Sequence, residues 1–282
     1  FFFSSRRRHT RYISVTGVQK CALPILPDVF GNHIFQTWLS AQGTSIQLNA
    51  LEQLAYVGQR GMGAWEYEPS IHLDAPASFR ITEMTQLLTE ILAEKETLSP
   101  EFANTEGLMN LFRIGTSAGG MRPKILVARN RKTQQILPGD LLYGPHHDAL
   151  LVKLNLENDP THPKEIIEFV YANIAQALGI DMMPCELWEG QHFVTHRFDR
   201  QNNRKQHVLT ASGLTGWDYQ NPEDSSYENL FKLSMALKLP WVELQQLYRR
   251  MVFNVLFNNI DDHLKNHSFL RSEEHTSELQ SH

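Results

Sequence analysis

The chain has 282 residues, a formal net charge of −5 at pH 7 and a hydrophobic fraction of 41%. These values are ordinary for a globular protein and provide no bulk positive charge for binding nucleic acid. No apolar run approaches the roughly 20 residues that a membrane-spanning helix needs. The composition therefore predicts a globular protein of one or two domains that is not a membrane protein.

Both ends of the chain read as translated sequencing adapter. Residues 271–282 follow one reading frame of a common library adapter, and residues 15–25 follow its reverse complement with one base changed. We therefore interpret residues 1–25 and 271–282 as not native and exclude them from the fold. The alternative, a basic N-terminal arm that binds nucleic acid, leaves the match between the two ends unexplained. A sequencing read across both junctions at the source locus would test this interpretation.

The remaining residues 26–270 are more acidic than the whole chain. They contain 20 Lys and Arg against 28 Asp and Glu, a net charge of −8, and a single cysteine, Cys185. One cysteine excludes an intrachain disulfide and favours a reducing compartment.

The spacing of apolar residues in the first part of the chain predicts three helices, over residues 28–41, 50–57 and 81–97. Residues 58–63 form a glycine-rich turn, whose glycines are not in the order of a dinucleotide-binding loop. Residues 64–69 resemble a strand. From residue 111 the pattern changes to strands and long loops, with residues 111–114 leading into a second glycine-rich segment.

The second part of the chain alternates strands and helices at first. We predict strands over residues 125–128 and 150–155, a helix over 165–178, a hairpin over 186–200 that turns at 189–191, helices over 227–237 and 241–258, and a strand over 268–270. Strands with one helix first and mainly helices afterwards predict an α+β fold with a small mixed lobe and a mainly helical lobe.

Asp261 and Asn266 give the strongest functional signal. An aspartate followed five positions later by an asparagine has the spacing of a phosphotransferase catalytic loop. In such a loop the aspartate accepts the proton of an attacking hydroxyl, and the asparagine holds a magnesium ion on the nucleotide phosphates. The pair follows an apolar helix and precedes a short strand, which is typical of an active-site loop on a rigid scaffold.

The glycine-rich segment 115–124 is a candidate phosphate-binding loop. Its glycines allow a tight bend that brings backbone N–H groups close to an anion, and Lys124 adds a positive charge at its exit. It is not a Walker A loop, because Met121 and Arg122 stand where that loop needs Lys and Ser or Thr. Taken alone, the segment is typical of an exposed turn.

Lys153 lies within an apolar strand. Apolar side chains alternate along residues 150–155, which places Lys153 on the strand face opposite Val152. A lysine in this setting needs a partner, because burying an unpaired charge is costly. A nucleotide phosphate would supply one, as would Glu165 or Glu168, one turn apart on the following helix. The alternative is an edge strand with the lysine in solvent.

These features follow one another in the order of a protein-kinase-like phosphotransferase. With them, the chain resembles the HipA-like serine/threonine kinases, which are toxins of bacterial type II toxin–antitoxin modules. The resemblance extends over residues 26–270, and its motifs lie at residues 57–64, 117–124, 196–200 and 261–268. It implies a two-lobed kinase-like fold, with a partial N-terminal subdomain at 26–105, the N-lobe with glycine-rich loop and hinge at 106–200, and a partial helical C-lobe at 201–270.

The resemblance also implies roles for individual residues. Asp261 would be the catalytic aspartate and Asn266 the magnesium ligand. Lys153 would pair with the phosphates and with Glu168, and Ser117 stands where some relatives autophosphorylate. The nucleotide-binding residues would be Gly119, Gly120, Met121, Arg122, Pro123, Lys124, Lys153, His196, Arg197, Phe198, His263, Leu264, Lys265 and Asn266, with positions 196–198 forming the hinge that reads adenine.

The resemblance further implies ATP and Mg²⁺ as cofactors and a cytoplasmic location. The expected partner is a helix-turn-helix antitoxin (HipB-like) that inhibits the kinase. The chain would contact DNA only indirectly, through this antitoxin. The expected substrate is a cytosolic protein, such as an aminoacyl-tRNA synthetase. In the family that the chain resembles, one substrate is glutamyl-tRNA synthetase. A second magnesium-binding aspartate is required after the catalytic strand, and residues 26–270 end before it. We therefore expect this chain to be a fragment without measurable phosphoryl transfer.

Two alternatives stay open from the residues alone. The first is a metal-dependent hydrolase that uses Asp261, Asp262 and His263 together with residues 146–148. Adjacent residues on an extended chain point in opposite directions and seldom share a metal, which counts against it. The second is a nucleotide- or antitoxin-binding module without turnover.

Overall fold

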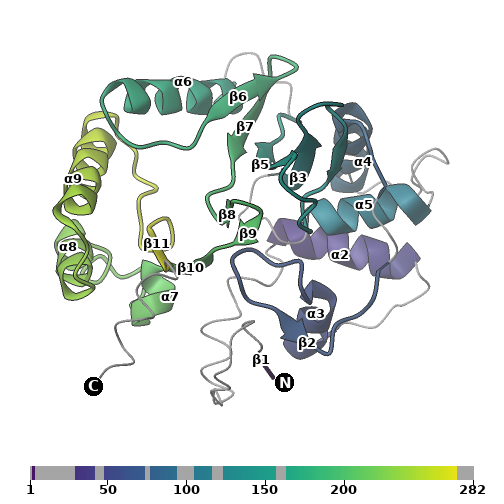
Figure 1. Cartoon of the computed structure of the whole chain (residues 1–282), viewed down its shortest axis with the longest axis horizontal. Coiled ribbons are helices and arrows are strands. Elements are labelled where there is room, and N and C mark those ends of the chain that lie inside the picture. Colours follow the sequence, from purple (N-terminus) through teal and green to yellow (C-terminus); the bar gives the residue numbers. More distant parts are fainter. Residues whose placement is uncertain are drawn as a thin grey trace. The chain divides into compact units, whose positions relative to one another are not determined.

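The computed structural model describes residues 2–3, 29–41, 48–73, 77–93, 105–115, 123–156 and 163–271. Within these ranges the protein is mixed α+β, with eight helices and a five-stranded antiparallel sheet. The chain divides into two compact units (Figure 1): the first holds Phe1–Phe169 and Met183–Lys205, and the second holds Val170–Met182 and Gln206–His282. The predicted lobe boundary after residue 200 stays a prediction.

The first unit is built on the five-stranded sheet. Its spatial order is β4 (Ile136–Pro138), β3 (Lys124–Asn130), β5 (His147–Lys153), β7 (His192–His196) and β6 (Cys185–Trp188). The predicted alternation in β5 is confirmed, because Leu150 and Val152 are fully buried while Lys153 is half-buried on the opposite face. The register places Lys153 opposite Lys124 and Leu150 opposite His196.

Three helices contribute to the core beneath one face of this sheet. They are α2 (Val29–Ala41), α4 (Ile81–Leu92) and α5 (Thr105–Gly115). Apolar side chains from all three join those of β3, β5 and β7 in one cluster. Within it the rings of Trp38 and Phe112 stack with centroids 4.4 Å apart. Burying a leucine or phenylalanine of this kind contributes roughly 1.5–3 kcal/mol, so this core fixes the sheet.

A short helix and a turn lie before the sheet in the sequence. Helix α3 (Ala50–Val57) begins with a capping box in which Asn49 Oδ1 accepts from the Glu52 N–H and Glu52 Oε2 accepts from the Asn49 N–H. It ends at Gly58, whose φ is +49°. A turn then leads to β2 (Tyr67–Glu68), which pairs with β1 (Phe2–Phe3).

The structure corrects part of the sequence interpretation. Residues 111–114, expected to begin the strand-rich part, are the last turn of helix α5. A short apolar run cannot distinguish strand from helix, and here Leu111 and Phe112 are buried on a helix that packs against α2. Helix α4 ends at Leu92, earlier than predicted, and residues 94–97 lie outside the described residues. Strand β4 was not predicted.

The second unit is mainly helical. It contains the later part of α6 (Lys164–Ala177), then α7 (Ala211–Thr215), α8 (Tyr227–Ala236) and α9 (Trp241–Leu256). Strands β10 (His207–Thr210) and β11 (Ser268–Arg271) form an antiparallel pair. A small core forms around Ala211, Leu230 and Leu264. Across the described ranges, every helix is too short or too polar to cross a bilayer.

Candidate functional site

The predicted site residues fall into two groups, one in each unit. In the second unit, Asp261 and Asn266 belong to one polar loop that follows α9. The Asn266 side chain donates from Nδ2 to the Asp261 carbonyl oxygen at 2.6 Å, and the Asn266 N–H donates to the His263 carbonyl at 2.8 Å. The five-residue spacing therefore closes a compact loop. The Asp261 side chain is 80% exposed and lies at the loop surface.

His263 lies beside the Asp261 carboxylate. Its Nε2 is 3.3 Å from Asp261 Oδ1, and its Nδ1 accepts from the Lys265 N–H at 3.3 Å. Because Nδ1 accepts, the proton of the neutral ring is on Nε2, from which it points to Asp261. The Lys265 ammonium lies over the Tyr219 ring, 3.7 Å from its centroid.

An apolar residue anchors this polar loop. Leu264 is fully buried in the small core with Ala211 and Leu230. The Ser212 N–H also donates to the Leu264 carbonyl at 3.4 Å. Leu264 was among the predicted nucleotide-binding residues, and the structure places its side chain in the protein interior. It holds the loop down while Asp261 stays exposed.

In the first unit, Lys153 and Glu168 form an ion pair. Lys153 Nζ donates to Glu168 Oε1, with both side chains about one-third exposed at 29% and 35%. Of the two glutamates that the sequence left open, the structure brings Glu168 to the lysine. The ammonium also lies 5.7 Å from the centroid of the Phe193 ring on β7. The pair is held between β5 and the first turns of α6.

The predicted phosphate-binding loop is described only at its exit. Ser117, Gly119, Gly120, Met121 and Arg122 lie outside the described residues. Pro123 and Lys124 are described: the Pro123 carbonyl accepts from the Leu154 N–H at 3.0 Å, and Lys124 begins β3 directly opposite Lys153. The loop therefore enters the sheet beside the lysine of the ion pair.

The predicted hinge follows strand β7. The Arg197 N–H donates to the Ala149 carbonyl at 2.9 Å, which extends the pairing of β7 with β5. His196 is half-buried and Phe198 is 37% exposed. The Arg197 side chain is directed inward: its NH1 donates to the Gly139 carbonyl at 2.7 Å and its remaining donors go to Asp199. Arg197 is only 3% exposed, and both its backbone N–H and its guanidinium are bonded within the protein.

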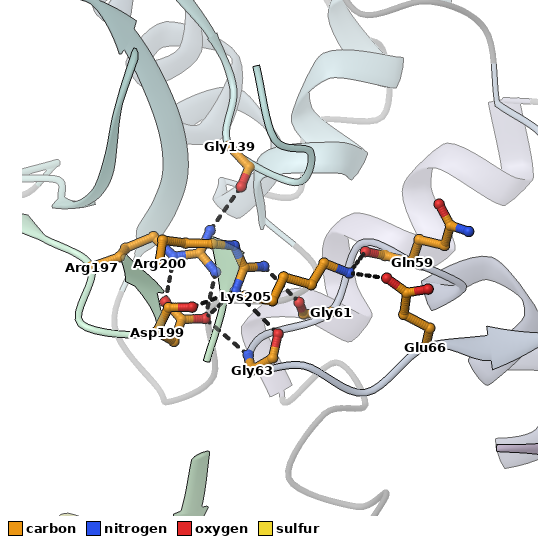
Figure 2. A network of polar contacts seen from close by, with 9 residues as sticks. All are labelled: Gln59, Gly61, Gly63, Glu66, Gly139, Arg197, Asp199, Arg200 and Lys205. Carbon is orange, nitrogen blue, oxygen red and sulfur yellow. Dashed lines mark hydrogen bonds and ion pairs between the residues drawn. The ribbon is translucent and has the colours of Figure 1, made fainter. Parts of the chain in front are cut away.

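Asp199 is the centre of a buried polar network (Figure 2). Its carboxylate accepts from Arg197 at 2.9 and 2.7 Å, from Arg200 NH1 at 2.7 Å and from the Gly63 N–H at 2.9 Å. The Asp199 and Arg200 side chains are only 2% and 3% exposed. Charge-assisted bonds of this kind are about twice as strong as neutral ones, so the carboxylate fixes both guanidinium groups.

The same network ties the turn at residues 58–66 to the sheet. Arg200 NH1 donates to the Gly63 carbonyl at 3.1 Å and NH2 to the Gly61 carbonyl at 3.0 Å. Lys205 donates to the Gln59 carbonyl and lies 3.0 Å from Glu66. Figure 2 shows these groups arranged around the turn. The glycine-rich turn is thus a structural element, as the order of its glycines indicated.

A second buried ion cluster lies at the turn after β4. Asp140 is fully buried, with Arg113 Nε at 2.8 Å and Arg60 Nε at 4.0 Å. Burial raises the pKa of Asp140, and the two guanidinium groups oppose that rise. Burial also lowers the pKa of Arg60 to about 10. Arg113 lies on the last turn of α5, so this cluster fixes the end of the helix from which the predicted phosphate loop begins.

The stability of the protein is expected to fall in acid because of Asp199. Burial alone would raise its pKa, but Arg197, Arg200 and the Gly63 N–H outweigh burial and lower it from 3.8 to about 2. A lowered carboxyl pKa stabilises the fold above pH 3.8, and the gain is lost as the pH falls towards 2. Wild type should therefore lose about 2 kcal/mol more than Asp199→Asn between pH 5 and pH 2. Urea unfolding at both pH values measures this; equal losses would contradict it.

The alternative of a hydrolytic metal centre finds no support. Across the part of the chain that the structure describes, no three His, Cys, Asp or Glu side chains are grouped to hold a metal ion. Asp148 is paired with Arg131 at 2.7 Å and Arg129 at 3.4 Å. His146 is exposed, whereas His147 is half-buried and begins β5.

The order of these features along the chain matches a known family. The model of the HipA-like C-terminal domain matches residues 116–279. The chain belongs to the HipA-like family. A search of curated proteins found no match. The matched segment includes the Lys153–Glu168 pair, the hinge and the Asp261 loop.

The HipA-like match also includes residues 272–279, which we interpret as adapter; that interpretation stays a prediction. The polar network crosses the start of the matched segment, because Asp199 and Arg200 lie inside it and residues 58–66 lie before it. The sequence assigned no role to Asp199, Arg200 or Lys205. The only signal available was that residues 57–64 and 196–200 both carry the family resemblance.

Proposed function

We propose that this HipA-like protein is an ATP-dependent serine/threonine protein kinase of the toxin type. The observation that carries the proposal is the Asp261 loop, which Asn266 Nδ2 closes by donating to the Asp261 backbone carbonyl at 2.6 Å, while the exposed Asp261 carboxylate lies 3.3 Å from His263 Nε2. An exposed, oriented carboxylate in a closed loop is what a phosphotransferase needs to receive a hydroxyl proton. The first unit, with its sheet and the Lys153–Glu168 pair, supports a two-lobed kinase-like fold.

In the proposed reaction, the hydroxyl oxygen of a serine or threonine attacks the γ-phosphorus of ATP. A new P–O bond forms, the bond to the ADP oxygen breaks, and the hydroxyl proton passes to the Asp261 carboxylate. His263 Nε2, 3.3 Å away, holds that carboxylate in place. Lys153 neutralises phosphate charge, and Glu168 orients the lysine. Residues 196–198 would contact adenine, and residues 119–124 together with His263, Lys265 and Asn266 the phosphates.

Asn266 fits the role of a magnesium ligand. Its Nδ2 is used by the bond to the Asp261 carbonyl, so the amide oxygen is the atom left to face a metal. Mg²⁺ takes one or two protein oxygen ligands and completes its shell with phosphates and waters, which agrees with a site without a cluster of carboxylates. When bound, the ion neutralises the charge of the nucleotide phosphates.

The family suggests the biological setting of this proposed activity. Its members are toxins, so we propose inhibition by a helix-turn-helix antitoxin, with DNA reached only through that partner. The substrate would be a cytoplasmic protein such as an aminoacyl-tRNA synthetase. Ser117 would be the autophosphorylation site, four residues beyond the buried Arg113 of α5.

Nucleotide affinity tests the role of the ion pair in the first unit. Lys153→Met should weaken binding of a non-hydrolysable ATP analogue with Mg²⁺ by about 10- to 100-fold, because one charge-assisted contact to phosphate is lost. Glu168→Gln should weaken it less, and the double variant should be no weaker than Lys153→Met, since the glutamate acts through the lysine. Titration calorimetry on the 282-residue chain measures these constants.

The control for this series is Lys232→Met, which removes an exposed lysine from α8. It should bind nucleotide as the wild type does. Equal affinities for Lys153→Met and wild type would overturn the assignment of Lys153. Nucleotide binding without phosphoryl transfer by the full gene product would instead support a binding module without turnover.

A further inference from the structure

The Asp261 loop is joined to helix α9 by side-chain hydrogen bonds. The Asp261 N–H donates to Asn259 Oδ1 at 3.3 Å, and Asn259 Nδ2 donates to Asn254 Oδ1 at 3.1 Å. Asn254 lies in the last turns of α9, a regular helix that provides a fixed position. The backbone of the catalytic aspartate is thereby connected through two asparagine side chains to a rigid element.

The connection continues to helix α8 and returns to the loop. Asn254 Nδ2 donates to the Tyr227 hydroxyl at 2.8 Å, and that hydroxyl donates to Asp262 Oδ2 at 2.9 Å. Tyr227 is the first residue of α8 and packs against the small core. Because Asp262 directly follows Asp261, the four bonds close a ring in which each group donates to the next.

The last hydrogen bond of the ring is accepted by the Asp262 carboxylate. A carboxylate only accepts, and a bond to a charged acceptor is stronger than one between neutral groups. Burial raises the pKa of Tyr227 to about 12, and Asp262 contributes to the rise, so the phenol keeps the proton that it donates. The direction of every bond in the ring is therefore fixed at neutral pH.

His267 supports the same loop from a second side. Its Nε2 lies 3.1 Å from the Asp262 carbonyl oxygen, and its ring meets the Tyr227 ring edge-on with centroids 5.7 Å apart. Burial lowers the pKa of His267, which keeps the ring neutral and able to donate one proton. The backbone of His267 accepts from the Ala211 N–H at 2.8 Å, which ties it to the core.

We propose that the two adjacent aspartates have separate tasks and that Tyr227 and Asn254 are positioning residues. Asp262 anchors the loop by accepting from Tyr227. Asp261, with its side chain 80% exposed, is left to receive the substrate proton. The hydrogen-bonded ring does not depend on any assumed activity, and only the role of Asp261 as proton acceptor rests on the proposed kinase function.

Hydrogen exchange in the 282-residue chain tests the ring. Tyr227→Phe removes the hydroxyl and keeps the packed ring, so it should speed amide exchange in residues 259–266 by about tenfold or more, while exchange in the helix interiors changes by less than about twofold. Tyr248→Phe is the matched control: it removes an exposed tyrosine hydroxyl from α9 and should leave exchange in residues 259–266 unchanged.

Conservative variants separate positioning from general destabilisation. Asp262→Asn retains an acceptor oxygen for Tyr227 and should remain close to wild type, whereas Asp262→Ala loses this bond and should speed exchange in the same residues, by no more than Tyr227→Phe does. The double variant of Tyr227→Phe with Asp262→Ala should be no worse than Tyr227→Phe alone, because the bond that Asp262→Ala removes is already lost with the Tyr227 hydroxyl. Unchanged exchange in Tyr227→Phe, or an equal increase throughout α8 and α9, would overturn the proposal.

Kinetics then connect the ring to function in the full gene product. Tyr227→Phe should lower kcat by about tenfold or more while KM for ATP stays within about twofold, since the loop is misplaced and the nucleotide contacts are kept. A wild-type protein without phosphoryl transfer would contradict the proposed function. The hydrogen-exchange result would still show whether the ring holds the Asp261 loop in place. If Tyr227→Phe lowered kcat without changing hydrogen exchange, the proposed positioning role of the ring would be contradicted.

Discussion

Replacing Asp261 by asparagine is expected to lower kcat for phosphoryl transfer by about 10²- to 10⁴-fold. Asparagine has nearly the same shape and can keep the contact with His263, but its neutral amide cannot take the proton of the attacking hydroxyl. Nucleotide affinity should stay within about twofold of wild type, because the loss falls on the transition state. The assay is transfer of labelled γ-phosphate by the full product of the source gene.

The control for this prediction is Glu243→Gln, which neutralises an exposed carboxylate in the first turn of α9. It should transfer phosphate at the wild-type rate. Should Asp261→Asn retain more than about one-tenth of wild-type kcat, Asp261 would not be the proton acceptor, and Asp262 or His263 would have to be considered.

Asp199→Asn is expected to lower the free energy of unfolding of the first unit by about 3–5 kcal/mol at neutral pH. The substitution leaves Arg197 and Arg200 buried without a counter-charge, and it places an amide NH₂ against their donors. The pH effect described above is smaller, because protonation leaves both carboxyl oxygens in place, whereas asparagine replaces one of them by an NH₂ group that cannot accept. Urea unfolding followed by circular dichroism measures the change.

The matched control is Glu83→Gln, which neutralises a carboxylate that is 46% exposed and 3.9 Å from an exposed Arg80. Exposed pairs contribute about 0–1 kcal/mol, so this variant should differ little from wild type. An Asp199→Asn variant with wild-type stability would show that the buried guanidinium groups find other acceptors or water.

Local patterns in the sequence were sufficient for much of the fold. Strand β5 was predicted because apolar residues at every second position can be buried on only one face, and Leu150 and Val152 are fully buried. Helix α3 was predicted at its observed bounds because Gly58 ends it. Helix α5 was missed at residues 111–114, because its short apolar run is compatible with either structure until its packing against α2 is known.

The parts of the candidate site that could be predicted are those whose residues lie close together in the sequence. The spacing of Asp261 and Asn266 sets a single loop, and its closing hydrogen bond spans five residues. The Lys153–Glu168 pair spans 15 residues, and helical spacing reduced the choice to two glutamates. Asp199 and Gly63 are 136 residues apart, so no sequence pattern connects them. The same holds for Tyr227 and Asp262, which are 35 residues apart.

The buried network around Asp199 sets a limit on how this protein can be divided or recombined. The segment recognised as the family domain starts at residue 116, yet its charged interior takes acceptors from Gly61 and Gly63, and its sheet rests on α2, α4 and α5. The matched family domain therefore lacks part of the core and of the polar network on which its sheet depends. Replacing the segment before residue 116 by an unrelated one would remove the glycine-rich turn that accepts from Arg200. The turn and the matched domain are therefore expected to have evolved together.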